Sequence, residues 1–339
     1  MNKLIKNFVG IDISKSWFDA AVVMADNDFK TEYRQFEQTQ KGFEQMLCWL
    51  KQNGINFVDQ TLFCMEYTGI YNSGLVNYLV KCQAQLWVEM PLRIKKASGL
   101  LRGSDDKSAA HMIAWYALRY RDSAKLWKPC DSGIEKIKHL IAQRERIIAS
   151  IITLTVPVNE LQKCGCNAEA KMMLKLQQPA IKSLEKAKLD IEKLIRTTIK
   201  ADEKLYHTIE LVQSVPGIGQ VTATALLVYT RGFTAFSNAK QLACYCGVVP
   251  FNKTSGSSVR YKPSVSPFAN MKLKKLLHLC ALSAIQNDKE MKYYYERKLL
   301  EGKNKMSIIN AVRNKLVHRV FAVIRDNRVY ELTNLKSCA

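Results

Sequence analysis

Residues 8–36 read FVGIDISKSWFDAAVVMADNDFKTEYRQF, and this stretch decides the fold of the first part of the chain. Two apolar runs, 8–13 and 18–24, flank the polar turn Ser14-Lys15-Ser16, and 29–36 follows as a third segment. Short apolar runs bounded by polar turns are typical of β-strands. The sequence therefore begins with three predicted antiparallel strands.

The next segments alternate helix-like and strand-like patterns. They are a helix near 40–52, a strand at 61–66, a helix at 71–82, a strand at 84–90 and a longer helix over about 105–121. The order β-β-β-α-β-α-β-α predicts an α/β domain, in which a mixed sheet with a parallel half carries helices on its faces.

From residue 134 to about 212 the apolar spacing is helical, with interruptions expected only at Pro157, around Cys164-Gly165-Cys166 and at Pro179. We interpret this stretch as a helical, coiled-coil-like arm, more typical of an oligomer contact than of an RNA reader. Further helices are expected near 221–230, 237–246, 269–286 and 305–327, around a polar, Ser-rich loop at 252–267. Three domains follow from this division, 1–125, 130–211 and 212–330.

Charge is the most informative part of the composition. Among 339 residues, 51 Lys+Arg stand against 30 Asp+Glu, a formal net charge of +21. From Val212 onward there are 20 basic and 6 acidic residues, so +14 of this excess lies in the last part of the chain. Such a balance indicates a polyanionic partner, with nucleic acid first.

Other classes of protein are excluded by pattern. The longest apolar run, 147–158, is too short to cross a bilayer, so no membrane role is expected. The ten cysteines lack zinc-site spacing and no signal peptide precedes them, which favours free thiols in a reducing cytoplasm.

Carboxylates in apolar strands are the candidate catalytic groups. Asp12 lies within the first strand and Glu66 ends the fourth, where charge is costly unless it is paired or binds a metal. In the predicted topology these strands are neighbours, and Asp105 and Asp106 begin the last helix nearby. An oxygen-only site for Mg²⁺ is the chemistry that this set suggests, and two such ions can serve phosphodiester transfer.

Two motifs in the last domain suggest phosphate contact. Pro216-Gly217-Ile218-Gly219 between helical patterns resembles a helix-hairpin-helix turn, in which Gly217 and Gly219 let backbone approach a phosphate. Hydroxyls at 254–258 lie among Lys253, Arg260 and Lys262. Spacing alone does not identify Ser255 as a nucleophile, because no base accompanies it in the sequence.

Together these segments resemble the DEDD-type insertion-sequence transposases of the IS one-ten family, above all its IS eleven-eleven subgroup, with the Piv-type DNA invertases as relatives. The matching stretches cover almost the whole chain. They are FVGIDISKSWFDAAV (8–22), CMEYTGIYN (64–72), RGSDDKSAAHMIAWYALRY (102–120), SVPGIGQVTATALL (214–227), LACYCGVVPFNKTSG (242–256) and EGKNKMSIINAVRNKLVHRVF (301–321).

This resemblance implies a RuvC-like, RNase H-fold catalytic domain, a coiled-coil arm and a C-terminal transposase domain with a catalytic serine. It implies a recombinase that joins donor and target DNA under the guidance of a structured bridge RNA, as a dimer or tetramer. It also implies a prokaryotic, cytoplasmic protein in association with the nucleoid. By similarity, Asp12, Glu66 and Asp106 are the Mg²⁺ ligands, and Ser255 is the nucleophile that forms a covalent link to DNA.

One position departs from the family pattern. The family run Arg-Gly-x-x-Asp-x-x-Asp-Ala-x-x-Ile-Ala aligns on Arg102–Ala114 and places Ala109 where the fourth acid belongs. Because residues three apart on a helix share a face, Ala109 removes one ligand beside Asp106, and we expect a catalytically weak or inactive chain. A shifted alignment that pairs Asp105 with Ser108 loses the match at Ile113-Ala114.

Two other functions compete with this interpretation. The first is a metal-dependent nuclease or Holliday-junction-type resolvase that hydrolyses DNA without serine chemistry. The second is a nucleic-acid-binding protein without activity, which Ala109 would produce if the metal site has failed.

Overall fold

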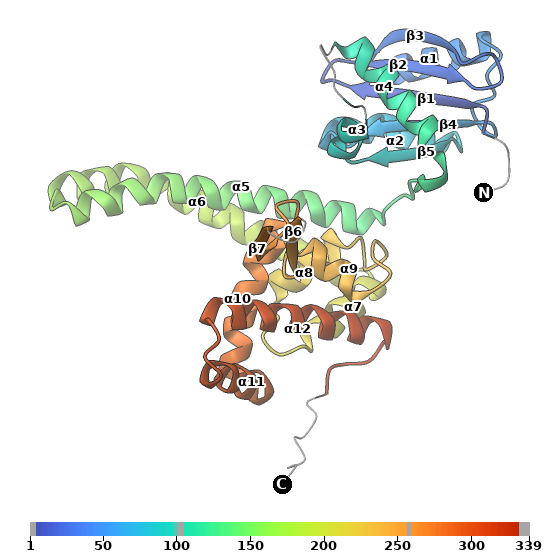
Figure 1. Ribbon diagram of the computed structural model, residues 1–339. Coiled ribbons are helices and arrows are strands. Elements are labelled where there is room, and N and C mark those ends of the chain that lie inside the picture. The colour runs from blue at the N-terminus through green and yellow to red at the C-terminus, as the bar shows by residue number, and fades with distance from the viewer. Residues whose placement is uncertain (1–4, 98, 100–104, 256–258, 332–339) are drawn as a thin grey trace. The chain divides into compact units, whose positions relative to one another are not determined.

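The computed structural model describes residues 5–97, 99, 105–255 and 259–331. The chain divides between Pro129 and Cys130 into two compact units (Figure 1). The three-domain division remains a prediction.

One five-stranded sheet forms the centre of the first unit, in the order β3-β2-β1-β4-β5. The strands are β1 (Asn7–Ile13), β2 (Trp17–Met24), β3 (Lys30–Glu37), β4 (Thr61–Glu66) and β5 (Gln85–Glu89). β1 pairs antiparallel with β2 but parallel with β4, and β4 pairs parallel with β5. The mixed sheet and its parallel half are confirmed, and this strand order fits the RNase H-like expectation.

Helices cover both faces of this sheet. They are α1 (Gln40–Gln52), α2 (Asn72–Lys81), α3 (Pro91–Ala97) and α4 (Asp106–Arg119). Odd-numbered residues of β1 pack with α1 and α2, whereas the even-numbered Phe8 belongs to a second cluster with Ile94 of α3 and Ile113 of α4. The two clusters follow from the alternation of side chains along a strand. The short helix α3 was not predicted.

Gly10 sets the distance between β1 and α4. A Cβ atom at Gly10 would lie 2.2 Å from the carbonyl oxygen of Ala110 and 2.2 Å from the backbone nitrogen of Ala114. Only glycine permits so close an approach of strand and helix. As a result, α4 packs directly on the strand that carries Asp12.

The second unit begins with two long helices, α5 (Ser132–Lys163) and α6 (Asn167–Lys200), that pack side by side as a hairpin (Figure 1). The expected breaks at Pro157 and Pro179 are wrong, because both prolines lie inside continuous helices. Both are exposed, so carbonyls freed by the missing N–H groups can bind water. Only the break around Cys164–Cys166 is present, and coiled-coil packing of the arm stays a prediction.

Shorter helices build the rest of this unit around one apolar core. They are α7 (Glu203–Gln213), α8 (Gln220–Tyr229), α9 (Ala239–Tyr245), α10 (Met271–Asn287), α11 (Lys289–Leu300) and α12 (Lys305–Arg325). The sequence analysis missed α11. Across the described ranges, no helix is long and apolar enough to span a membrane.

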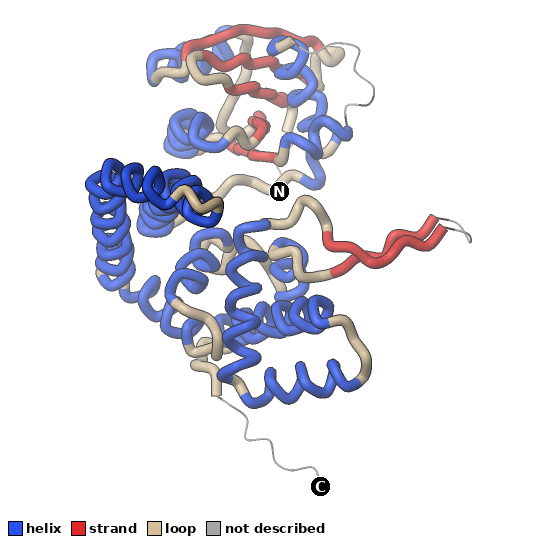
Figure 2. Tube along the Cα trace, turned by 90° about the vertical axis from the view of Figure 1, so that its left-hand side faces the viewer, coloured by secondary structure: helices blue, strands red, loops and turns tan. Residues whose placement is uncertain are grey.

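A β-hairpin replaces most of the loop expected at 252–267. Its strands, β6 (Pro250–Ser255) and β7 (Val259–Val265), pair antiparallel and extend away from the helices (Figure 2). The prediction was wrong because Phe251, Thr254, Val259, Tyr261 and Val265 supply the aromatic and β-branched residues that favour strands, whereas we gave the serines more weight.

Candidate active site

The sheet brings Asp12 and Glu66 together. In the parallel ladder Ile11 lies opposite Met65, so Asp12 and Glu66 are the next residues on adjacent strands. Both occur near the carboxyl ends of their strands and are partly buried. This neighbourhood was predicted from the element order and is present.

Asp106 comes from the start of α4. The preceding residue, Asp105, is the N-cap: its carboxylate accepts a hydrogen bond from the Ser108 backbone N–H, and Ser108 Oγ accepts one from the Asp105 N–H. This capping box occupies Asp105 and Ser108. Asp106 and Ala109 take no part in this cap, and their correspondence to the family's third and fourth acids stays a prediction.

Burial and like charges both act on the acids of this site. Burial, and next the charge of Asp106, raises the pKa of Asp12 above its ordinary 3.8. Burial, and next the charge of Asp12, raises the pKa of Glu66 above its ordinary 4.5. Lys95 of α3 acts in the opposite direction on both. Asp12 thus lies close enough to Asp106 and to Glu66 for like charges to repel, a condition that a cation relieves.

Sequence analysis missed two further buried acids on the same face of the sheet. Asp19 lies directly opposite Asp12 in the β1–β2 ladder and is 2% exposed. Tyr33 Oη donates to Asp19 at 2.5 Å, and this bond is the main cause that raises the pKa of Tyr33 to about 12. Gln35 also donates to Asp19.

The second missed acid is Glu89, which lies opposite Glu66 in the β4–β5 ladder and is buried. Tyr116 of α4 donates to it at 3.4 Å. Both acids carry the signal that identified Asp12 and Glu66, a carboxylate within or at the end of an apolar run.

The donor set suits a divalent cation in its chemistry, because Mg²⁺ prefers carboxylate oxygens and neutralises their repulsion. Within the described ranges, however, no three acidic, His or Cys side chains converge tightly enough to hold a metal ion. Ala109 lies three residues after Asp106 on α4, and its side chain offers no ligand.

Ser255 ends β6, and its backbone pairs with Val259 across the hairpin. Lys253 pairs with Tyr261 in this ladder and Thr254 with Arg260, while Lys262 belongs to β7. The hairpin thus carries the candidate nucleophile and these basic residues on two strands.

The two glycines of the Pro216–Gly219 turn differ. Gly217 has φ +87°, and a Cβ there would lie 2.7 Å from the carbonyl oxygen of Cys280 and 2.9 Å from Ala284, so its open side is filled by α10. Gly219 is the N-cap of α8 and has open space around it. The positive φ and the packing on α10 therefore require glycine at position 217, whereas no packing contact requires it at position 219. Phosphate contact by these two glycines stays a prediction. The helix-hairpin-helix itself stays a prediction.

Comparison with known proteins identifies the family. The model of the DEDD transposase domain of IS110 elements, described as a transposase, matches residues 9–163, and the model described as "Transposase IS116/IS110/IS902 family" matches 209–296. The pilin gene-inverting protein of Moraxella bovis is 27% identical over 96% of this chain and 98% of its own length. A 43.6 kDa protein of element IS110 from Streptomyces coelicolor is 28% identical over 65% of this chain and 53% of its own length.

Among solved structures, Thermus thermophilus RuvC in complex with a Holliday junction substrate aligns with 36% of this chain and 99% of its own, at 12% identity and a TM-score of 0.27. That alignment is too weak to carry an argument. The family models and relatives lead to one assignment: the chain belongs to the IS110 family of DNA transposases and is related to the pilin gene-inverting recombinases.

Proposed function

We propose that this chain is the recombinase of an insertion sequence, that it joins DNA through a serine–DNA link with the help of divalent cations, and that Ala109 weakens it. The observation that carries the proposal is the meeting of Asp12 and Glu66 on adjacent parallel strands, with Asp106 near enough to raise the pKa of Asp12. The match of the DEDD domain to residues 9–163 supports the use of divalent metal.

Asp12, Glu66 and Asp106 would hold the cation, which we take to be Mg²⁺. The chemistry that such an ion supplies is neutralisation of phosphate charge and activation of an oxygen nucleophile or leaving group. The carboxylates would hold this charge at the carboxyl ends of β1 and β4, where their partial burial reduces screening by water.

Ser255 would supply the nucleophile. Its Oγ forms a bond to phosphorus as the bond from phosphorus to the deoxyribose oxygen breaks. The serine loses its proton, and the departing oxygen gains one. Lys253, Arg260 and Lys262 in the same hairpin would hold the phosphate backbone, and attack by a second DNA end would release the serine.

Restoring the missing acid tests the metal site. Ala109→Asp should raise strand-exchange activity on the order of 10–100-fold, the effect typical of restoring one ligand or support of a metal site. The measurement is recombination of a donor and a target plasmid at fixed Mg²⁺. Ala109→Asn is the control of equal size without charge. Equal activity in all three proteins would show that position 109 is not the fourth acid.

Removing the serine separates a recombinase from a nuclease. Ser255→Ala should abolish the covalent protein–DNA adduct, detected by denaturing electrophoresis of labelled DNA in the Ala109→Asp background. Ser257→Ala is the matched control and should retain the adduct. If Ser255→Ala leaves Mg²⁺-dependent hydrolysis intact and no protein forms an adduct, the metal-dependent nuclease is the correct function.

The resemblance also supports guidance by a bridge RNA and assembly into a dimer or tetramer, and the strong positive charge is compatible with RNA. Both are tested by purifying the protein, expressed with its flanking DNA, and sequencing the nucleic acid that accompanies it. One discrete structured RNA from the end of the element is expected. Random nucleic acid would instead indicate recombination by protein alone.

A further inference from the structure

A chain of alternating aromatic and basic side chains connects α11 to α12. The guanidinium of Arg297 lies over the ring of Tyr293 at 5.8 Å and over that of Tyr294 at 5.9 Å. On α12, Lys315 Nζ lies 4.7 Å from the centre of the Tyr294 ring. Tyr293 is 57% exposed and packs against no core cluster in the part of the chain described, so its ring has a free face.

Beside Lys315 the surface is hollowed. A cavity of about 240 Å³ lies between α11 and α12, and its lining residues are Met291, Asn314, Lys315, His318 and Arg319. The Oδ1 atom of Asn314 is buried and has no hydrogen-bond partner among the described residues. The cavity is smaller than the roughly 300–1,000 Å³ of drug-sized pockets and suits one ring or phosphate.

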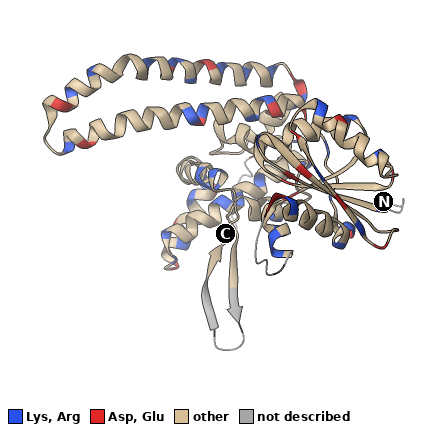
Figure 3. Ribbon diagram, turned by 90° about the horizontal axis from the view of Figure 1, so that it is seen from above, with Lys and Arg blue, Asp and Glu red and all other residues tan. Residues whose placement is uncertain are grey.

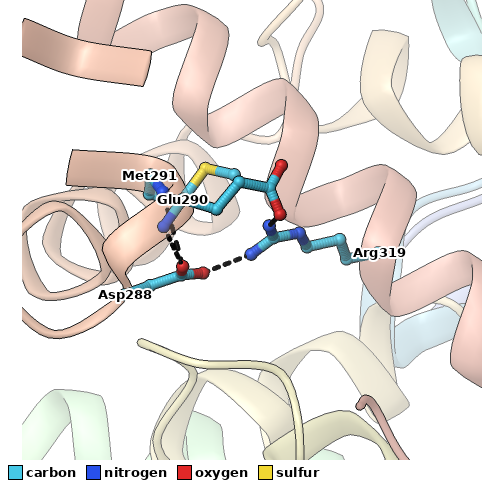
Figure 4. Close-up of polar contacts among 4 residues, drawn as sticks. All are labelled: Asp288, Glu290, Met291 and Arg319. Carbon is cyan, nitrogen blue, oxygen red and sulfur yellow. Dashed lines mark hydrogen bonds and ion pairs between the residues drawn. The ribbon is translucent and has the colours of Figure 1, made fainter. Parts of the chain in front are cut away.

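The two helices that form this surface, α11 and α12, are held together by ion pairs. Asp288 caps α11 by accepting from the backbone N–H of Glu290, and Arg319 of α12 donates to the carboxylates of Asp288 and Glu290, each at 2.5 Å (Figure 4). Asp288 is 1% exposed. This buried bridge fixes α11 against α12, so the aromatic–basic surface is preformed.

We propose that this surface, Tyr293, Arg297, Tyr294, Lys315 and the Asn314 cavity, binds a single-stranded segment of nucleic acid. Exposed aromatic rings offer stacking only to unpaired bases, and the interleaved cations fit the phosphates between them. Residues 130–339 carry 34 Lys+Arg against 17 Asp+Glu, which gives charge complementarity to a polyanion (Figure 3). The inference rests on the proposed recombinase, which requires strand opening, and assigns that task a surface separate from the hairpin.

The test is fluorescence anisotropy of the full chain with labelled oligothymidylate, oligouridylate and duplex DNA of about 20 nucleotides, longer than most single-strand sites. Tyr293→Ala should weaken binding of a single strand about tenfold, the loss of one stacked base, and leave duplex affinity unchanged. Tyr293→Phe should restore it. Because Tyr293 is exposed, these variants keep the fold.

The contribution of the Lys315 charge to phosphate binding is tested separately. Lys315→Ala should lower the slope of log affinity against log salt by about 0.7 for a single strand, the value for one phosphate contact. Lys182→Ala, an exposed lysine on α6, is the matched control and should leave the slope as it is. A defect confined to oligouridylate assigns the surface to RNA, and one confined to oligothymidylate assigns it to DNA.

The outcomes distinguish a failure of this surface assignment from a failure of the proposed recombinase function. If the wild-type chain binds single strands and Tyr293→Ala and Lys315→Ala bind them equally well, the surface assignment is wrong and the recombinase stands. If the wild-type chain binds neither single strands nor duplex, both fail.

Discussion

At the scale of single residues, the buried acids of the candidate site lower the stability of the folded chain. The pKa values of Asp12 and Glu66 are raised, first by burial and then by neighbouring acids. At a pH above the ordinary pKa values, these two carboxyl groups ionise without cost in the unfolded chain, whereas the folded chain disfavours their ionised form. Each carboxylate therefore destabilises the metal-free native state at neutral pH, and this cost vanishes below the ordinary values, where both states are protonated.

Asp12→Asn and Glu66→Gln should consequently raise the melting temperature of the chelator-treated protein at pH 7, by about 2–4 °C for each kcal/mol recovered. The gain should disappear as the pH falls below about 4. Thermal unfolding followed by circular dichroism at both pH values measures this. A lower melting temperature of both variants at pH 7 would show that the carboxylates stabilise the metal-free fold, contrary to this prediction.

Sequence pattern alone led to Asp12, Glu66 and the pair Asp105–Asp106, because each stands where charge is conspicuous, and the family resemblance then selected Asp106. Asp19 and Glu89 carry the same signal and were overlooked; strand pairing shows that they lie beside Asp12 and Glu66. The sequence also did not show that Gly217 packs against α10.

At the scale of elements, α11 is held by the buried bridge from Arg319. The guanidinium lies against Asp288 and Glu290 on one side and over the Tyr330 ring at 4.7 Å on the other. Removing one partner of a buried ion pair leaves the other charge without compensation. This contact joins helices that the sequence pattern does not link, which is one reason that α11 escaped prediction.

Arg319→Ala should therefore lower the free energy of unfolding of the second unit by about 3–5 kcal/mol. Urea denaturation gives the value. Arg325→Ala removes an exposed ion pair with Asp326 on the same helix and should cause no measurable change. Equal stability of the two variants would show that Asp288 finds another partner.

At the scale of the molecule, the chain consists of two units with separate cores. The first unit carries the candidate acids on its sheet and at the start of α4, and the second carries the hairpin and the helices from which it extends. The strands of the first sheet were predicted well from the sequence, because strand alternation and turns are local signals. The sequence analysis predicted the hairpin and the unbroken arm poorly, because we gave the serines of the hairpin and the prolines of the arm more weight than the residues around them. It missed α11, which is held by a contact with α12.

Separate cores should unfold in separate steps, as multi-domain proteins commonly do. Differential scanning calorimetry of the metal-free chain should show two transitions. Asp12→Asn should move only one of them, and Arg319→Ala only the other. A single transition that both variants move would mean that the units unfold together.

The division of the chain at Pro129 separates two parts of very different net charge. Residues 1–129 carry 17 Lys+Arg against 13 Asp+Glu, so only +4 of the total charge of +21 resides there. A protease that nicks the chain between the units would therefore yield two fragments that a cation-exchange column separates in one gradient. The nearly neutral fragment, which carries the candidate acids, should leave the column early and free of the contaminating nucleic acid that its basic counterpart retains.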